Sequence, residues 1–129
     1  MTKQVLLKYI ANIEDSISKH KAPHLTPILC DCSESTSPSF SPDGKKITFS
    51  GRINGRRQIW IYDIKTKKTQ QVTSGPEDHE NPCFASNSNH IIYNTTYPKT
   101  DIFILSLANK NKRKLTTGIG DKHYPNCEK

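Results

Sequence analysis

Acidic residues and a histidine gather in one short segment of the chain. Glu77, Asp78 and Glu80 flank His79, and a carboxylate beside an imidazole is the pair that general acid–base catalysis uses. The segment comes directly before an expected strand, where such a cluster more often forms a binding or capping surface. No Gly-x-Ser-x-Gly elbow, Walker loop or Gly-x-Gly-x-x-Gly fingerprint occurs in the sequence. We therefore expect no enzyme activity, no catalytic residue and no cofactor.

Cysteines and histidines stand at spacings that superficially resemble those of metal ligands: His79-x-x-x-Cys83, His123-x-x-x-Cys127 and Cys30-x-Cys32. The two His-x-x-x-Cys pairs are not equivalent, because His79 lies three residues before a proline and His123 lies two before the next one. Alternate residues of a strand point to opposite faces, so the pairs would not present their ligands alike. We expect no metal site, and we interpret the cysteines as ordinary buried thiols.

Positive charge dominates the chain, which carries a formal net charge of +7. It concentrates in two runs, Lys65-Thr66-Lys67-Lys68 and Lys110-Asn111-Lys112-Arg113-Lys114. Net charge alone leaves nucleic acid, anionic lipid or an acidic protein open as partners. No aromatic residues interleave with these lysines, as a platform for a single nucleic-acid strand requires. We interpret both runs as a solvated outer rim rather than a phosphate-binding patch, and we expect no nucleic-acid partner.

The elements that must position these residues repeat along the chain. Residues 38–50 predict a β-hairpin whose structural turn residues are Pro42, Asp43 and Gly44. Pro42 takes the second position of a type I turn, and Gly44 supplies the left-handed residue that closes the turn as a bulge. Residues 82–94 are a weaker copy, 44 residues further on. The copy has Asn87-Ser88 in place of Asp43-Gly44, which asparagine tolerates because it enters the left-handed region.

A second pair of segments repeats at almost the same distance. Residues 59–64 and 72–75 match residues 102–107 and 115–118 at a period of 43. A period of this size, with four short strands per repeat, is typical of a β-propeller blade. The sequence therefore predicts an all-β fold, an incomplete β-propeller with about two full four-stranded blades plus flanking partial blades.

The period divides the chain into parts. We expect residues 1–35 to hold strands c and d of a partial blade and a connector, residues 36–79 and 80–121 to form one complete blade each, and residues 122–129 to begin a further blade. Residues 1–26 leave an alternative open, because their apolar residues also fall on one helical face: Val5, Leu6, Tyr9, Ile10, Ile13 and Ile17. We favour strands there, since the repeat register supports them independently.

The repeat resembles that of a known family. Residues 38–75, with Ser41-Pro42-Asp43-Gly44, the run from Gln58 to Asp63 and Val72-Thr73, look like the repeat of the C-terminal six-bladed propeller of the TolB family. Tricorn-type and prolyl-oligopeptidase-type propellers share this repeat. The resemblance implies a non-enzymatic, periplasmic scaffold of the Tol-Pal envelope system that binds the peptidoglycan-associated lipoprotein. The alternative is the propeller of such a serine peptidase whose catalytic domain is missing.

The length and the apolar runs set further expectations. Six blades of this period need about 260 residues, so the 129 residues look like the C-terminal fragment of a longer protein. The longest apolar runs are far shorter than the roughly 20 residues that span a bilayer, and we expect no membrane insertion. The opening residues lack the features of a signal peptide. This predicts a cytoplasmic location for the chain as it stands, whereas the family resemblance implies the periplasm.

We expect a partner to bind at one mouth of the central channel, where the residues directly before the first strand of each blade would lie. These positions are polar and differ between blades: Ser35, Thr36, Ser37, His79, Glu80, Asn81, Lys122 and His123. We also expect self-association through open blade faces, because repeat arrays need polar caps at their ends. Those faces would be lined by Ile59, Ile61, Phe103 and Leu105 or their partners.

Overall fold

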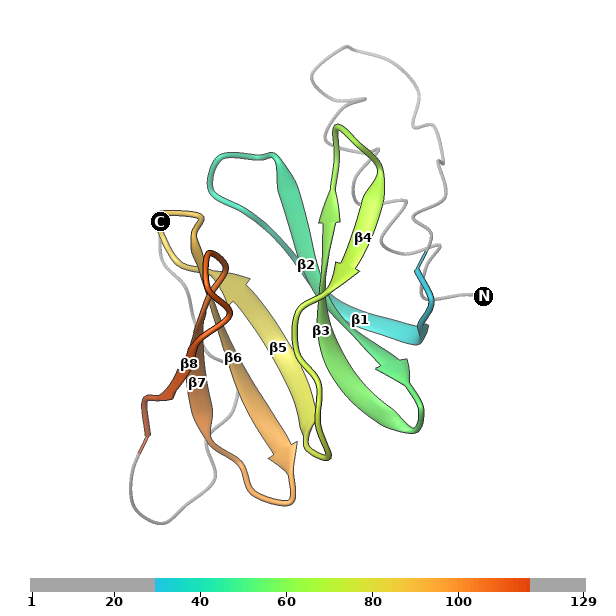
Figure 1. The fold of residues 1–129 in the computed structure, drawn as a ribbon, viewed down its shortest axis with the longest axis vertical. Helices are drawn as coiled ribbons and strands as arrows, with labels where there is room; N and C mark the ends of the chain where they lie inside the picture. Colours follow the sequence, from blue (N-terminus) through green and yellow to red (C-terminus); the bar gives the residue numbers. More distant parts are fainter. Residues whose placement is uncertain (1–29, 117–129) are drawn as a thin grey trace.

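The structure, a computed structural model, describes residues 30–116 (Figure 1). Within this range the chain forms strands and no helix: β1 (Ser33–Phe40), β2 (Lys46–Ile53), β3 (Arg56–Asp63), β4 (Lys68–Gln71), β5 (Asp78–Phe84), β6 (His90–Tyr97), β7 (Ile102–Ser106) and β8 (Lys112–Lys114). The predictions for residues 1–26 and for residues 122–129 lie outside the described residues.

The strands form two four-stranded antiparallel sheets, in the orders β1-β2-β3-β4 and β5-β6-β7-β8. In each sheet, neighbours in the sequence are also neighbours in space, so each sheet is a simple meander. The second sheet packs on the first through β5, which contacts β1, β2 and β3. Two successive four-stranded meanders packed in this way are the arrangement of neighbouring propeller blades. The prediction of an all-β, incomplete propeller is confirmed.

The first strand of each sheet begins earlier than the sequence predicts. The sequence placed this strand near Pro38 in the first repeat and near Pro82 in the second, whereas β1 begins at Ser33 and β5 at Asp78. Both strands contain a bulge, because the register shifts between Thr36 and Ser39 and again between Glu80 and Cys83. A bulge adds a residue and interrupts the alternation of faces, so the apolar pattern that marks a strand is lost.

The two bulges are built alike. Ser37 in β1 and Asn81 in β5 take left-handed φ angles of 55° and 52°. These residues are separated by 44 positions, the length of the repeat. The sequence repeat is therefore also a repeat of backbone conformation, because the same position in the first strand of each sheet takes a left-handed φ.

The first hairpin has the predicted turn. Gly44 N–H donates to the Ser41 carbonyl at 2.9 Å, and Gly44 has a φ of 72°. Asp43 completes the turn through its side chain, which accepts hydrogen bonds from the Ser41 hydroxyl at 2.6 Å and the Lys45 N–H at 3.0 Å. The roles expected of Pro42, Asp43 and Gly44 as turn residues agree with this geometry.

The second hairpin corrects one detail. Ser88, not Asn87, takes the left-handed conformation, with a φ of 59°. Asn87 instead takes the place of Asp43, because its side-chain oxygen accepts a hydrogen bond from Asn89 N–H at 2.9 Å. The asparagine side chain is thus used to close the turn, and the serine bears the backbone strain.

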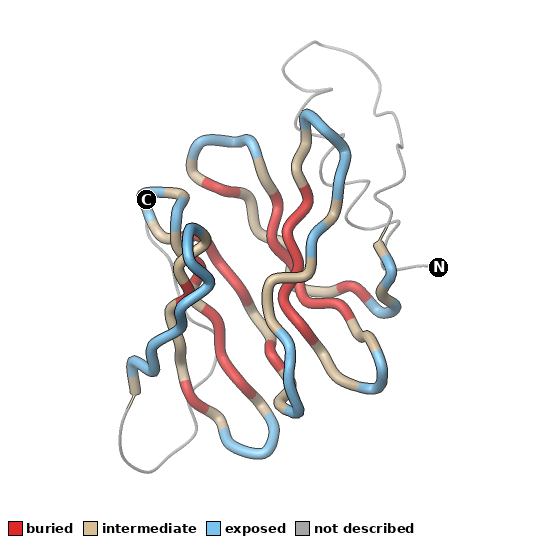
Figure 2. Tube along the Cα trace, in the orientation of Figure 1, coloured by how far each residue is buried: buried red, intermediate tan, exposed pale blue. Residues whose placement is uncertain are grey.

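The main core lies between the two sheets. Side chains from β3, β5, β6 and β7 meet there: Ile59, Ile61, Phe84, Ile91, Tyr93 and Leu105. A second buried cluster lies on the other face of the first sheet and contains Ile47, Phe49, Trp60 and Tyr62. Figure 2 shows the buried residues running along the middle of the strands, while the turns are exposed. Both faces of the first sheet are therefore covered.

Stacked aromatic pairs recur between the second and third strands of the sheets. Phe49 stacks on Trp60 with ring centroids 6.5 Å apart, and Tyr93 stacks on Phe103 at 5.7 Å. In each case the two residues face each other across the antiparallel ladder. Cross-strand aromatic pairs of this kind fix the register of a sheet.

The residues named for open blade faces need correction. Ile59, Ile61 and Leu105 are buried in the core between the sheets, and Phe103 packs against the same core. These side chains already have a neighbouring sheet, so they do not line an open face. Self-association itself stays a prediction.

Replacing Ser88 with glycine should stabilise the protein by about 1 kcal/mol, because glycine adopts a positive φ without the steric cost that serine meets. Chemical denaturation followed by circular dichroism measures the change. Gly44→Ser, the opposite change at the equivalent turn position, is the matched control and should destabilise by a similar amount, because a Cβ atom there meets no other atom within 4 Å and the backbone cost dominates. A neutral or destabilising Ser88→Gly would contradict the strain argument.

Candidate protein-binding site

The structure places the predicted partner-binding residues within strands rather than before them. Ser35, Thr36 and Ser37 belong to β1, and His79, Glu80 and Asn81 belong to β5. The prediction that these residues lie in loops is wrong, because β1 and β5, each with a bulge, begin earlier and include them. The two groups nevertheless come close together, since β1 and β5 are in contact. Lys122 and His123 lie outside the described residues.

The equivalent bulge residues bond to each other across the two sheets. The Ser37 hydroxyl donates to the side-chain oxygen of Asn81 at 3.1 Å. The amide nitrogen of Asn81 in turn donates to Asn94 Oδ1 in β6 at 2.9 Å. The polar side chains of Ser37 and Asn81 are therefore used to join the sheets, which limits what they offer to a partner.

The remaining predicted residues divide into buried and accessible ones. Ser35 and His79 are fully buried, at 0% exposure, and a partner could not reach them. Thr36 and Glu80 are half-buried and lie on either side of the boundary between the sheets. Of the described residues in the predicted site, these two are the best placed to face a ligand.

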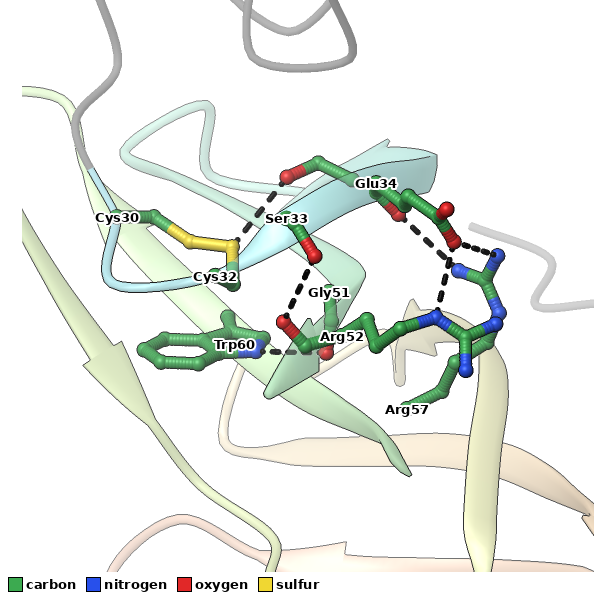
Figure 3. The surroundings of a disulfide bond; sticks show 9 residues. Cys30, Cys32, Ser33, Glu34, Gly51, Arg52, Arg57 and Trp60 are labelled. Atoms are coloured by element: carbon green, nitrogen blue, oxygen red, sulfur yellow. Dashed lines mark hydrogen bonds and ion pairs between the residues drawn. A yellow bond between two sulfur atoms is a disulfide. The ribbon is translucent and has the colours of Figure 1, made fainter. Parts of the chain in front are cut away.

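Arg57, which the sequence analysis did not single out, connects Thr36 with Glu80. The Arg57 guanidinium donates to Thr36 Oγ1 at 3.2 Å and to the Glu34 carbonyl at 3.1 Å. Its Nε lies 3.7 Å from a carboxylate oxygen of Glu80, and its Nη2 lies 3.5 Å from Glu34. Arg52 reaches the same Glu34 carboxylate at 2.9 Å. Figure 3 shows both arginines converging on Glu34. We call Glu34, Thr36, Arg52, Arg57 and Glu80 the seam network.

A second arginine crosses the boundary beside this network. Arg56 at the start of β3 lies over the ring of Tyr97 at the end of β6, 4.3 Å from its centroid. Its guanidinium also donates to Asp78 at 3.2 Å, and the other oxygen of Asp78 accepts from Arg57 N–H at 2.9 Å. Tyr97 is 51% exposed. The pair Arg56 and Tyr97, which we call the cross-blade platform, presents a cation and an aromatic ring to solvent.

The sequence did contain a signal for these arginines. Arg52, Arg56 and Arg57 flank Asn54-Gly55, a residue pair typical of a hairpin turn. Such a turn projects its flanking residues at one end of a hairpin. The sequence could not predict the acidic partners of these arginines, because Glu34 comes from β1 and Asp78 and Glu80 come from β5.

The cysteines differ from the prediction of buried thiols. Cys30 and Cys32 form a disulfide, and Cys83 is disulfide-bonded as well. The Cys30–Cys32 bridge lies over Gly51, whose carbonyl accepts a hydrogen bond from Trp60 Nε1 at 3.2 Å (Figure 3). A Cβ atom at position 51 would approach Cys32 Sγ to 2.6 Å, so only glycine fits beneath the bridge. The spacing of Cys30 and Cys32 alone did not predict this disulfide, because two residues so close in sequence meet only where the chain turns sharply.

No group of three or more His, Cys, Asp or Glu side chains that could hold a metal ion occurs in residues 30–116. The same residues contain no helix long and apolar enough to cross a membrane. The acidic segment around His79 also forms no acid–base pair directed at solvent. His79 Nδ1 faces the Arg57 carbonyl at 3.4 Å, and its Nε2 lies 3.8 Å from Glu77.

Burial lowers the pKa of His79, while its hydrogen bond to Arg57 and the charge of Glu77 act in the opposite direction. Because the folded-state pKa lies below the unfolded value of about 6.5, the unfolded chain binds more protons in the interval between them. Stability contributed by neutral His79 is therefore present above about pH 6.5 and decreases as the pH falls below it.

Substituting His79 with phenylalanine should reduce this acid sensitivity, because the buried ring no longer takes up a proton. The free energy of unfolding is measured by denaturant titration between about pH 7 and pH 5. The wild type should lose more stability over this range than His79→Phe. The same substitution at the half-buried His90 is the control. An identical pH dependence in wild type and His79→Phe would contradict the assignment.

A profile of the family described as the dipeptidyl peptidase IV (DPP IV) N-terminal region matches residues 41–126. Among curated relatives, a Protein TolB homolog of Protochlamydia amoebophila is 52% identical over 48 residues, which cover 37% of this chain and 10% of the relative. The Tol-Pal system protein TolB of Nitratidesulfovibrio vulgaris is 30% identical over 82 residues, covering 64% of this chain and 19% of the relative.

Among solved structures, a putative TolB from Agrobacterium tumefaciens superposes with a TM-score of 0.71 at 20% sequence identity. The match covers 81% of this chain and 37% of that one. This likeness establishes the fold, a TolB-like β-propeller of which the chain forms a part. The matched segments span about a tenth to a fifth of the two curated relatives.

Proposed function

Since the chain belongs to the family of the dipeptidyl peptidase IV N-terminal region, we propose that it is the propeller part of a non-enzymatic, protein-binding scaffold of the TolB type. Its relatives named TolB support this assignment, one of them by a name that includes the Tol-Pal system. The proposed partner is the peptidoglycan-associated lipoprotein, and the proposed location is the periplasm. The scaffold acts by holding a fixed surface toward its partner, without chemistry of its own.

The observation that carries this proposal is the cross-blade platform. Arg56 comes from one sheet and Tyr97 from the other, and the guanidinium lies 4.3 Å from the ring centroid. Arginine and tyrosine are among the residues that dominate the energy of protein interfaces. Each is held before a partner arrives, Arg56 by Asp78 and Tyr97 by the overlying Arg56. A surface that is ordered in advance loses less entropy on binding.

The seam network extends this surface. Thr36 and Glu80, both in the original set of partner-binding residues, remain candidates for contact and are joined through Arg57. Glu80 also accepts a hydrogen bond from Thr96 at 2.6 Å, so its carboxylate is oriented. Ser35 and His79 are buried and offer no contact to a partner, while Ser37 and Asn81 join the sheets. The contact roles of Lys122 and His123 stay predictions.

Affinity for the soluble domain of the lipoprotein tests the proposal. Replacing Tyr97 or Arg56 with alanine should weaken binding about tenfold or more, because each removes a solvent-facing part of the platform. Isothermal titration calorimetry measures the affinity, and a thermal melt verifies that the fold is kept. Lys65→Ala, in the exposed turn between β3 and β4, is the control for loss of a surface cation. Full affinity in both platform variants would refute the proposed surface.

Glu80 offers a second and more conservative test. Glu80→Gln keeps the size of the side chain and removes its charge, so we expect weaker lipoprotein binding. Because Glu80 also faces the Arg57 guanidinium at 3.7 Å, a thermal melt separates this effect from a loss of stability. His79→Ala is unsuitable for this purpose, since His79 is buried and its loss would act through stability.

The alternative is the propeller of a serine peptidase, and the name of the matched family favours keeping it. The two functions predict different behaviour of the protein in its native form. A peptidase would react with a fluorophosphonate probe, which labels activated serines. A scaffold would remain unlabelled and would copurify with the lipoprotein. Labelling of the native protein would replace the scaffold proposal with the peptidase.

A further inference from the structure

A disulfide stands directly before β1, apart from the cross-blade platform and the seam network. Cys30 and Cys32 are bridged across a single residue, with their Cα atoms 5.2 Å apart. Both cysteines are half-buried and pack against the second buried cluster, which contains Trp60. Figure 3 shows the bridge beside Gly51 and Trp60. The proposed protein-binding surface makes no use of this bridge.

The bridge is poorly placed to stabilise the fold. A disulfide acts mainly by restricting the unfolded chain, and this effect grows with the number of residues that it encloses. Only Asp31 lies between the two cysteines, so the bridge restricts the unfolded chain little. Structural disulfides resist reduction, whereas exposed ones are the labile, regulatory or catalytic ones. A half-buried bridge across one residue belongs with the second group.

The two sulfur atoms differ in their access to a reagent. Cys30 lines an open cavity of about 530 Å³, together with Asp31, Trp60, Lys67, Lys68 and Thr69. Cys32 does not line this cavity. It lies instead against Gly51, where an added Cβ atom would come within 2.6 Å of Cys32 Sγ. A reagent that enters the cavity therefore reaches Cys30 first.

A buried hydroxyl is directed at the other sulfur atom. Ser35 Oγ lies 3.4 Å from Cys32 Sγ, and Ser35 has 0% exposure. A bridged sulfur carries no proton, so the hydroxyl is the donor. This hydrogen bond becomes stronger when Cys32 becomes a thiolate, because hydrogen bonds to charged acceptors are stronger than those to neutral ones. Cys32 is thus prepared as the leaving group when the bridge opens.

We propose that the Cys30–Cys32 bridge is a thiol–disulfide exchange site for a thiol that enters this cavity. The incoming thiol releases its proton to solvent, and its thiolate attacks Cys30 Sγ. A mixed disulfide forms at Cys30, and the bond to Cys32 breaks. Cys32 leaves as a thiolate beside the Ser35 hydroxyl and takes up a proton from solvent.

A second thiol completes the exchange. It attacks the sulfur of the incoming molecule in the mixed disulfide, and Cys30 leaves as a thiolate that is protonated in turn. The protein gains two electrons and two protons, and the two thiols become a disulfide. A dithiol supplies both steps from one molecule.

Trp60 provides a natural reporter for the opening of the bridge. It is the single tryptophan of the chain, and it lines the same cavity as Cys30. A disulfide quenches indole fluorescence at short range by accepting an electron from the excited ring, and a thiol quenches it less. Opening of the bridge should therefore raise the fluorescence of Trp60 in the folded protein.

Reduction of the folded 129-residue chain tests the proposal. The chain is titrated with dithiothreitol without denaturant, while Trp60 fluorescence and far-UV circular dichroism are recorded. Free thiols are alkylated and assigned by mass spectrometry. We expect alkylation of Cys30 and Cys32 to accompany the rise in fluorescence, while the circular dichroism stays that of the native fold. The double variant Cys30→Ser/Cys32→Ser retains Trp60 and Cys83 but lacks the bridge, and its fluorescence should not rise.

The position of attack is read from the mixed disulfide. A short incubation with 2-mercaptoethanol, stopped with acid, should leave the adduct on Cys30 rather than on Cys32. Ser35→Ala should slow the opening about fivefold, because the leaving thiolate loses its hydrogen bond. The adduct should then be distributed more evenly between the two cysteines. Ser33→Ala is the matched control and should react like the wild type, since the Ser33 hydroxyl donates to the Arg52 carbonyl and not to the bridge.

Three results would overturn the proposal: a bridge that stays oxidised until the chain unfolds, an adduct mainly on Cys32, or the same rate and adduct position in wild type and Ser35→Ala. The first two are measured on the wild type, so they remain decisive even where Ser35→Ala does not fold. The test is independent of the lipoprotein, since the bridge and Ser35 belong to neither the cross-blade platform nor the seam network.

Discussion

The packing of β3 against the second sheet is the interaction on which the rest of the structure depends. Ile59 and Ile61 of β3 are buried against Phe84, Ile91 and other residues of the second sheet. Trp60 and Tyr62, which alternate with them, are buried on the opposite face. A strand that is apolar on both faces has no side for water, so its sheet requires a neighbour on each side. The stability of one blade is therefore inseparable from that of the next.

This packing brings polar side chains of β1, β3 and β5 close together. Arg57 is only 15% exposed at its side chain, and a charge removed from water to this extent needs compensating partners. Glu34, Thr36 and Glu80 provide them from β1 and β5. The apolar core brings the sheets together without directional preference, whereas these bonds require a defined geometry. Burial thus supplies the attraction between blades, and the seam network fixes their relative orientation.

Features decided by local chemistry could be predicted from the sequence. The turn at Pro42 and Gly44 follows from the conformations of these two residues, and its recurrence 44 residues later gave the repeat and the fold. The beginnings of β1 and β5 could not be predicted, because the bulges at Ser37 and Asn81 hide the alternation of faces. Arg57 was missed for a different reason. Its role depends on acids from other strands, and their meeting is a property of the packed sheets.

The hydrogen bond between Ser37 and Asn81 has a further consequence when the blades are regarded as subunits of an assembly. It joins equivalent positions of consecutive repeats, with the donor on one and the acceptor on the next. This is a head-to-tail contact, in which each unit carries two different surfaces, and such contacts produce a ring when the rotation between units closes. Asn81 also bonds Asn94 within its own sheet. A substitution of Asn81 therefore affects both the bonding within its own blade and the contact of that blade with the preceding one.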